Sequence, residues 1–142
     1  YTLEALYRTG QGKELLRRLD FWKGLKAQGF TTVVESPEPA RSDCHAWGAH
    51  PLWHMQASLA GIRPAAPGFK RVTIAPCPGN LERIDATCPH PLGNIRVSWR
   101  KTGSTWSAEV ELPPNTTGVW RFNGSEQALK PGCTKISGTI PR

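Results

Sequence analysis

The chain has 142 residues, the length of one ordinary domain or of two small units that share an interface. Of these residues 38% are hydrophobic and 20% are charged, a composition that is typical of globular proteins and not of disordered ones. No apolar run approaches the length that spans a bilayer, so we expect no membrane partner. The formal charge of +7 is thinly spread, with basic residues adjacent only at Arg17-Arg18, Lys70-Arg71 and Arg100-Lys101. Nucleic-acid-binding proteins usually concentrate their positive charge, and we therefore expect no nucleic-acid partner.

The first thirty residues predict two short helices joined by a glycine turn. One apolar stripe falls on a single helical face near the N-terminus, and a second runs from Lys13 to Gln28 between charged residues. The stripes consist of Leu3, Leu6 and Tyr7, and of Leu15, Leu19, Trp22 and Leu25. Gly10 and Gly12 interrupt the pattern, and Gly29 stands where a helix commonly ends, so we expect a helical hairpin.

A third helix is expected before the middle of the chain, and its start has two interpretations. The Pro-rich segment 36–39 keeps the preceding loop extended. The helix either begins at Ser42 or Asp43 and runs to about Ala60 with a kink at Pro51, or Pro51 marks its first turn after a separate turn. Its apolar residues lie on more than one side, so we expect it to be largely buried. They are Leu52, Trp53, Met55 and Leu59.

After a Pro- and Gly-rich linker over residues 62–69, the apolar pattern changes to a period of two. This alternation predicts half-buried antiparallel strands, and Gly103 predicts a hairpin between two of them. The apolar positions are Val72 and Ile74, then Ile95, Val97 and Trp99, then Trp106, Ala108, Val110 and Leu112. We therefore expect an α+β chain. Residues 1–61 form the end of a larger helical domain, because three helices alone bury too little surface, and residues 70–142 form a small antiparallel β-sandwich.

Cys44, Cys77, Cys88 and Cys133 have no C-x-x-C spacing, so no structural zinc site is expected. They either form two disulfides in an oxidising compartment or stay reduced, and we favour free thiols. The chain starts at Tyr1, within a helical pattern and without a methionine or a leader. We expect the natural N-terminus to lie upstream, which leaves both a cytoplasmic and an exported location open.

Side chains suited to a sugar gather in the segment 31–54. Glu35 enters the Pro-rich loop, where a glutamate is usually just solvated, but a carboxylate there can also activate a water molecule. His45 most simply stabilises the start of a helix. Trp47 is most simply a core residue, although an indole face can also stack on a sugar ring. Taken singly, each residue has an ordinary structural role, and only their grouping suggests a site.

Two histidines in the same segment raise the alternative of a metal site. His50 and His54 have the i, i+4 spacing of two ligands on one helix face, with Asp43 nearby. Pro51 disturbs that face and no H-E-x-x-H motif accompanies the pair, so metal is the weaker alternative. The G-x-S-x-G, P-loop and G-x-G-x-x-G motifs of other catalytic classes are missing from the sequence.

Three runs of this sequence resemble bacterial α-L-rhamnosidases of glycoside hydrolase family 78. They are TTVVES at 31–36, RSDCHAWGAHPLWHM at 41–55 and LAGIRPAAPGFKRVTIAPCPGNL at 59–81. The resemblance implies the last helices of an α/α barrel of six hairpins, followed by a C-terminal β-sandwich domain. It also implies an enzyme that removes terminal α-L-rhamnose from glycosides with inversion.

The same resemblance implies roles for individual residues. Glu35 matches the general base of the family, His45 matches a histidine that contacts the bound rhamnose, and Trp47 is similar in position to a pocket aromatic. No segment here corresponds to the general acid. The implied partners are a rhamnose-containing glycoside and the barrel upstream of Tyr1, no cofactor is implied, and the chain alone is expected to be inactive. The alternative is a non-catalytic carbohydrate-binding or structural module formed by residues 70–142.

Overall fold

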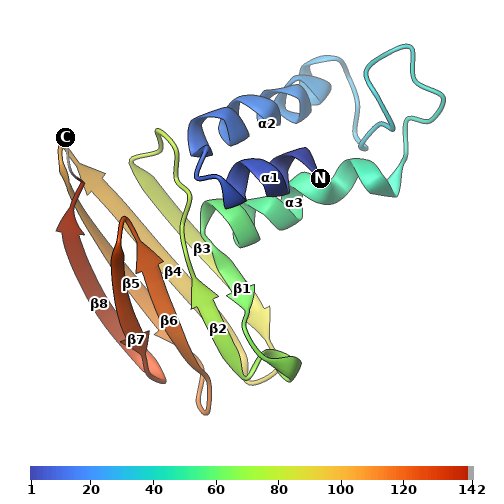
Figure 1. Ribbon diagram of the computed structural model, residues 1–142. Coiled ribbons are helices and arrows are strands. Elements are labelled where there is room, and N and C mark those ends of the chain that lie inside the picture. Colours follow the sequence, from blue (N-terminus) through green and yellow to red (C-terminus); the bar gives the residue numbers. More distant parts are fainter. Residues whose placement is uncertain (141–142) are drawn as a thin grey trace.

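The computed structural model describes residues 1–140 and places a group of helices beside a sandwich of two four-stranded sheets (Figure 1). The helices are α1 (Thr2–Arg8), α2 (Gly12–Ala27) and α3 (His50–His54). The strands are β1 (Ile62–Pro64), β2 (Arg71–Ile74), β3 (Arg83–His90), β4 (Gly93–Thr102), β5 (Thr105–Leu112), β6 (Thr117–Phe122), β7 (Ser125–Leu129) and β8 (Gly132–Thr139). The predicted α+β class is confirmed.

Helices α1 and α2 form the predicted hairpin. Gly10 makes the turn between them with a φ of 69°, a left-handed conformation that a residue with a Cβ adopts only at a cost. The apolar stripe of α2 faces inward, with Leu15, Leu19 and Leu25 all buried. The first two of these leucines belong to one hydrophobic core that continues into the sheets. The hairpin therefore rests on the sandwich through its apolar face.

The third helical segment is broken into three short pieces. A 3-10 turn covers Ala46–Ala49, helix α3 follows with Pro51 in its first turn, and a π-helical turn covers Met55–Leu59. Of the two interpretations of its start, the second is therefore correct. Proline suits the first turn of a helix, because the N–H group that it lacks has no partner there in any case.

The expectation that this segment is largely buried was wrong for its apolar outer side. Leu52, Trp53 and Met55 are 67%, 53% and 47% exposed. The segment packs inward through His54, Ser58 and their neighbours, and nothing within residues 1–140 covers the opposite side. Tyr1 and Trp47 are also exposed on this helical part of the molecule.

The two sheets have the strand orders β1-β2-β6-β7 and β3-β4-β5-β8. The expected antiparallel sandwich is confirmed in every strand pairing except that of β2 with β6, which is parallel. The chain enters β6 after completing three strands of the other sheet, and this crossover sets the parallel direction. Strand β1 lies within the segment 62–69, where Pro64 had hidden any strand signal, and Ile62 pairs with Ile74 of β2.

The predicted alternation in the β half is confirmed by the burial of its apolar positions. On strand β4, Ile95, Val97 and Trp99 are at most 1% exposed, while the side chains between them face outward. Trp120 of β6 stacks on Trp106 of β5 with ring centroids 5.6 Å apart. Aromatic rings from both sheets thus fill the centre of the sandwich.

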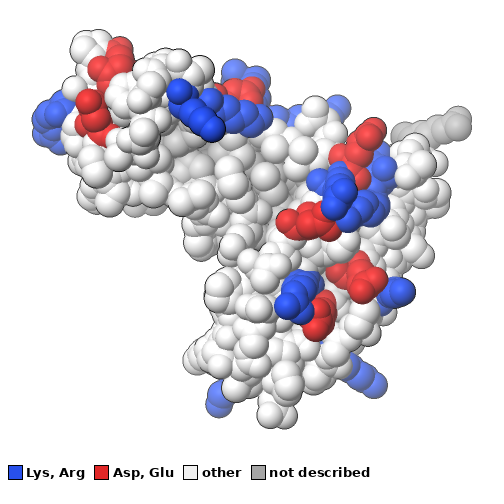
Figure 2. Space-filling model, turned by 180° about the vertical axis from the view of Figure 1, so that it is seen from behind, with Lys and Arg blue, Asp and Glu red and all other residues white. Residues whose placement is uncertain are grey.

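Charges of both signs are mixed on the outer face of the sandwich that Figure 2 shows from behind. The arginines of this region are paired with acids, as in Arg100 with Asp85 at 2.7 Å and Arg96 with Glu111 at 2.7 Å.

No helix of residues 1–140 has both the length and the apolar composition to cross a membrane. The four cysteines are free thiols, of which Cys77 is buried.

Arg63 of β1 connects the sandwich to the helices through a charged contact. Its guanidinium donates two hydrogen bonds to the carboxylate of Glu4 on α1, at 3.0 and 2.9 Å. Glu4 also accepts a hydrogen bond from Arg8 at 2.8 Å. Such a two-pronged contact fixes direction as well as distance, and it holds α1 against the first strand of the sandwich.

This contact predicts a loss of stability in acid. Arg63, followed by Arg8, lowers the pKa of Glu4 from 4.5 to about 2. Because the folded pKa lies below the unfolded one, the pair stabilises the fold above pH 4.5, and this contribution is lost as the pH falls toward about 2. We expect the stability difference between the wild type and Glu4→Gln to shrink across this window in urea denaturation. Glu38→Gln, at an exposed position, is the control. If the stability difference between the wild type and Glu4→Gln stayed the same at every pH, the prediction would be contradicted.

Candidate sugar site in the helical segment

A closed loop brings Glu35 and His45 to neighbouring positions. The amide of Glu35 donates to the carbonyl of Ser42 at 2.9 Å, and the amide of His45 donates to the carbonyl of Val33 at 2.8 Å. These two backbone bonds join the start and the end of the Pro-rich loop. Val34 between them is 2% exposed and anchors the loop to the helices.

Gly48 lets the 3-10 turn approach this loop closely. A Cβ built on Gly48 would lie 2.5 Å from the carbonyl oxygen of Val34, which no real side chain tolerates. The carbonyl of Gly48 in turn accepts a hydrogen bond from the indole Nε1 of Trp22 at 2.7 Å. Helix α2, the loop and the 3-10 turn therefore meet at one point.

A cavity of about 540 Å³ opens where these elements meet. Its lining combines one carboxylate with aromatic rings and backbone. The lining residues are Tyr1, Thr2, Leu3, Arg18, Phe21, Trp22, Val34, Glu35, Ser36, Pro37, Trp47, Gly48 and His50. Two of the three predicted site residues, Glu35 and Trp47, therefore share this cavity. His45 is not among its lining residues, but its ring stacks on that of Trp47, with centroids 6.3 Å apart and planes 23° apart.

Glu35 is held by a partner that the sequence interpretation missed. Arg41 donates from Nε to Oε2 at 3.0 Å and from Nη2 to Oε1 at 2.5 Å. The Arg41 side chain is 80% exposed, whereas that of Glu35 is 27% exposed. Glu35 is the one carboxylate among the described residues that line the cavity. The sequence carried no signal for this pair, because it depends on how the loop closes.

Trp22 and His50 form a wall of the cavity that was also missed. Trp22 read as part of the apolar stripe of α2, and His50 was considered only as a metal ligand. Their rings meet edge-on with centroids 5.2 Å apart. Burial lowers the pKa of His50, so its imidazole favours the neutral form.

His54 lies behind this wall and not in the cavity. Its Nδ1 is 2.8 Å from Ser58 Oγ, and its ring stands at 89° to that of His50 with centroids 5.8 Å apart. Within residues 1–140, no group of three His, Cys, Asp or Glu side chains is arranged to hold a metal ion. The i, i+4 spacing of the two histidines reflects ring packing inside the helical segment.

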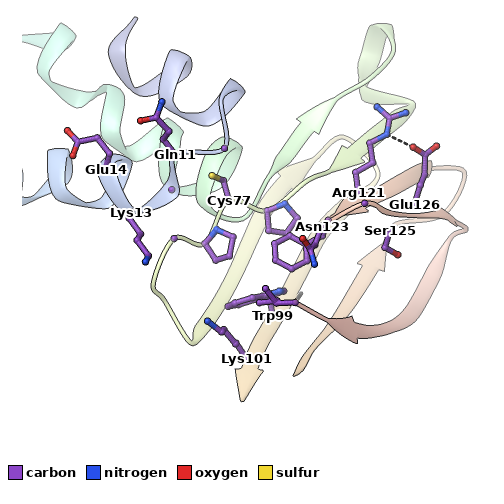
Figure 3. Close-up of a pocket in the computed structure, with 18 residues that line it drawn as sticks. Gln11, Lys13, Glu14, Cys77, Trp99, Lys101, Arg121, Asn123, Ser125 and Glu126 are labelled. Carbon is purple, nitrogen blue, oxygen red and sulfur yellow. Dashed lines mark hydrogen bonds and ion pairs between the residues drawn. The ribbon is translucent and has the colours of Figure 1, made fainter. Parts of the chain in front are cut away.

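A larger hollow of about 830 Å³ lies elsewhere, between the start of α2 and the β6–β7 hairpin (Figure 3). Neither Glu35 nor Trp47 lines it. Both acids at its edge are already paired, Glu126 with Arg121 at 2.8 Å and Glu14 with two arginines of its own helix. The smaller cavity beside Glu35 is therefore the better candidate for a site that uses a carboxylate.

Comparison with known proteins identifies the family. Residues 61–136 match the model of the bacterial α-L-rhamnosidase C-terminal domain, which is more than half of the 142-residue chain. The chain belongs to this family. The resemblance noted in the sequence is thereby confirmed, and the match begins at Gly61, directly before strand β1.

Individual relatives of this chain are named α-L-rhamnosidase. An α-L-rhamnosidase of Formosa agariphila is 38% identical over 94 residues, which cover 65% of this chain and 10% of the relative. One of Streptomyces avermitilis is 32% identical over 101 residues, covering 70% of this chain and 9% of the relative. The chain thus spans about a tenth of the length of the curated relatives that it matches.

Solved structures extend the similarity into the helices. The Streptomyces avermitilis α-L-rhamnosidase complexed with L-rhamnose matches 83% of this chain and 15% of its own, with a TM-score of 0.69 at 21% identity. The family 78 rhamnosidase of Bacillus sp. GL1 matches 84% of this chain and 14% of its own, with a TM-score of 0.67 at 25% identity. Both matches cover more of the chain than the sandwich alone, so they also include part of the helical segment.

Proposed function

We propose that this chain is the C-terminal part of an inverting α-L-rhamnosidase and that Glu35 is its water-activating base. The observation that carries the proposal is the cavity in which Glu35 lies beside the indoles of Trp22 and Trp47. A carboxylate can take a proton from water, while flat aromatic faces suit the apolar side of a sugar ring. The family membership supplies the class of substrate, a glycoside that ends in α-L-rhamnose.

The ion pair with Arg41 has to open for this role. Both oxygens of Glu35 are occupied by the guanidinium, so one of them must exchange Arg41 for the attacking water. The exposure of Arg41 makes that exchange inexpensive, because an exposed ion pair contributes little net stability. His45, stacked on Trp47, is proposed to donate a hydrogen bond to a rhamnose hydroxyl.

An inverting site needs a second carboxyl group about 6.5–9.5 Å from the first. No other carboxylate of residues 1–140 lines the cavity, so we propose that the acid comes from the barrel upstream of Tyr1. The exposed faces of Tyr1, Trp53 and Met55 support this proposal, since a large apolar surface usually marks a contact with further protein. Residues 1–61 would then close the six-hairpin barrel, and residues 70–142 would be the C-terminal domain.

The experiment that tests the proposed function is a rhamnoside assay of the full-length gene product. Release of L-rhamnose from an aryl α-L-rhamnoside, with the β anomer as first product in an NMR time course, is the expected result. The chain of residues 1–142 alone is expected to release none. A full-length protein that cleaves no rhamnoside would refute the proposal.

Trp47→Ala is expected to weaken substrate binding in the full-length enzyme without unfolding it. We expect KM for the rhamnoside to rise about two- to tenfold, the range of an aromatic contact of roughly 0.5–1.5 kcal/mol. The stability of the 142-residue chain should hardly change, because Trp47 is 79% exposed in it. Trp47→Phe is the matched control and should retain most of the affinity. Equal KM values for the alanine variant and the wild type would remove Trp47 from the site.

A further inference from the structure

Arg63 is held in one orientation by several groups at the junction of the sandwich and the helices. Only 19% of its side chain is exposed. In addition to the two hydrogen bonds to Glu4, Nε donates to the carbonyl of Ala57 at 2.6 Å and Nη2 donates to Ser58 Oγ at 3.1 Å. The guanidinium also lies 3.8 Å from the centroid of the Tyr7 ring. Two hydrogen bonds would be enough to join β1 to α1, so the additional contacts indicate that the guanidinium has a further structural role.

The contact with Ser58 fixes the direction of a buried hydroxyl. Arginine can only donate hydrogen bonds, so Ser58 Oγ accepts from Arg63. Ser58 is fully buried, and within residues 1–140 its hydroxyl has two partners, Arg63 and the Nδ1 atom of His54 at 2.8 Å. The hydroxyl proton therefore points to Nδ1, because a buried donor without an acceptor is costly.

This direction determines the tautomer of His54. With Nδ1 accepting a hydrogen bond, the proton of the neutral imidazole resides on Nε2. Burial, followed by the nearby His50, lowers the pKa of His54, which agrees with a neutral ring. Arg63 thus acts on His54 through a relay of two hydrogen bonds.

The ring of His54 supports the wall of the sugar cavity from behind. It packs edge-on against His50, and His50 packs edge-on against Trp22. Trp22 is fixed in turn by its indole hydrogen bond to Gly48, and Trp22, Gly48 and His50 all line the cavity that contains Glu35. His54 is therefore connected by direct ring contacts to side chains that line the cavity.

We propose that Arg63 is a positioning residue for the sugar pocket, which sets the tautomer and ring orientation of His54 through Ser58 and thereby places His50 and Trp22. The identity of the ligand rests on the proposed function, while the hydrogen-bond relay does not. In this way the first strand of the C-terminal domain contributes to sugar binding without touching the sugar.

The relay is tested in the 142-residue chain by NMR of ¹⁵N-labelled imidazoles and indoles. In the wild type we expect His54 as a single Nε2–H tautomer and slow solvent exchange of the Trp22 indole N–H. Arg63→Met frees the Ser58 hydroxyl, so we expect mixed tautomers and indole exchange faster by roughly tenfold, as for an opening made about 1.4 kcal/mol easier. The exposed Arg83→Met is the control. A pure Nε2–H tautomer in Arg63→Met would overturn the proposal.

Two further variants separate the relay from general destabilisation. Arg63→Lys retains a donor for Ser58 and should restore the single tautomer, although it cannot bind Glu4 in the same two-pronged way. Ser58→Ala keeps the contact of Arg63 with Glu4 but removes the relay, and it should mix the tautomers. Loss of the single tautomer in Arg63→Lys, or its retention in Ser58→Ala, would contradict the relay.

The functional arm uses the full-length enzyme and an aryl α-L-rhamnoside. For Ser58→Ala and Arg63→Met we expect KM to rise roughly tenfold with kcat nearly unchanged, because a displaced wall weakens the binding of substrate and transition state equally. Arg83→Met should change neither constant. Unchanged KM in both variants would overturn the positioning role. If the wild type cleaves no rhamnoside, the proposed function fails, and the NMR measurements then decide the role of Arg63.

Discussion

Replacement of Glu35 by glutamine is expected to lower kcat for rhamnoside hydrolysis by about 10²–10⁴-fold in the full-length enzyme, the usual contribution of a general base. An amide of the same shape fills the same place but cannot take a proton from water. The backbone bond from residue 35 to Ser42 does not involve the side chain, so the loop should keep its path. Steady-state kinetics with an aryl α-L-rhamnoside measure the effect.

Glu38→Gln is the matched control for this prediction. Glu38 belongs to the same loop and is exposed, its carboxylate accepts a hydrogen bond from the Ala40 amide at 2.9 Å, and it does not line the cavity. Its replacement should leave kcat and KM close to those of the wild type. A near-ultraviolet circular dichroism spectrum verifies that both variants are folded. If Glu35→Gln turned over substrate like Glu38→Gln, Glu35 would not be the base.

The largest expected effect on stability follows from Trp120→Ala. Trp120 is fully buried between the two sheets and stacks on Trp106. Its truncation leaves a cavity that the surrounding rings cannot fill, and similar substitutions cost about 3–5 kcal/mol of unfolding free energy. Urea or guanidinium denaturation of the 142-residue chain measures this loss.

Trp120→Phe distinguishes packing from hydrogen bonding at the same position. The indole Nε1 of Trp120 has no hydrogen-bond partner among the described residues, so phenylalanine gives up packing area but no hydrogen bond. We expect its cost to be clearly smaller than that of alanine. Trp47→Ala serves as the surface control, with an expected change within about 0.5 kcal/mol. Equal losses for Trp120→Ala and Trp47→Ala would mean that the sandwich core does not govern stability.

The parts of the fold with strong periodicity could be predicted from the sequence. Alternation on β4 and β5 identified the buried face, and the stripe of α2 identified its inner side. Such a pattern arises within a single helix or strand, because one side of the element faces the core and the other faces solvent. The broken segment 46–59 was harder to predict from the sequence, since 3-10 and π-helical turns leave no clear apolar period. Pro51 indicated the correct start, but the exposed apolar side of this segment depends on what covers it.

Some residues of the candidate site could likewise be predicted from the sequence, and others could not. Glu35 and Trp47 could be selected because each carries suitable chemistry and lies in a recognisable run of sequence. Arg41 and Trp22 could not, since their roles arise from closure of a loop and from the contact of α2 with residues far along the chain. Arg63 lies in a Pro- and Gly-rich run, and nothing in the sequence indicated a role for it.

Sequence patterns alone identified the family and the α+β class, and they suggested Glu35, His45 and Trp47 as candidate residues of a sugar site. Local periodicity and a specific order of motifs are enough for these, because they depend on neighbours within one element or run. The folded structure was needed to see that β1 pairs with β2, that β2 lies parallel to β6, and that Arg63 faces Glu4 and Ser58. Such contacts join residues whose proximity is set by how whole elements pack, and no short stretch of sequence encodes that packing.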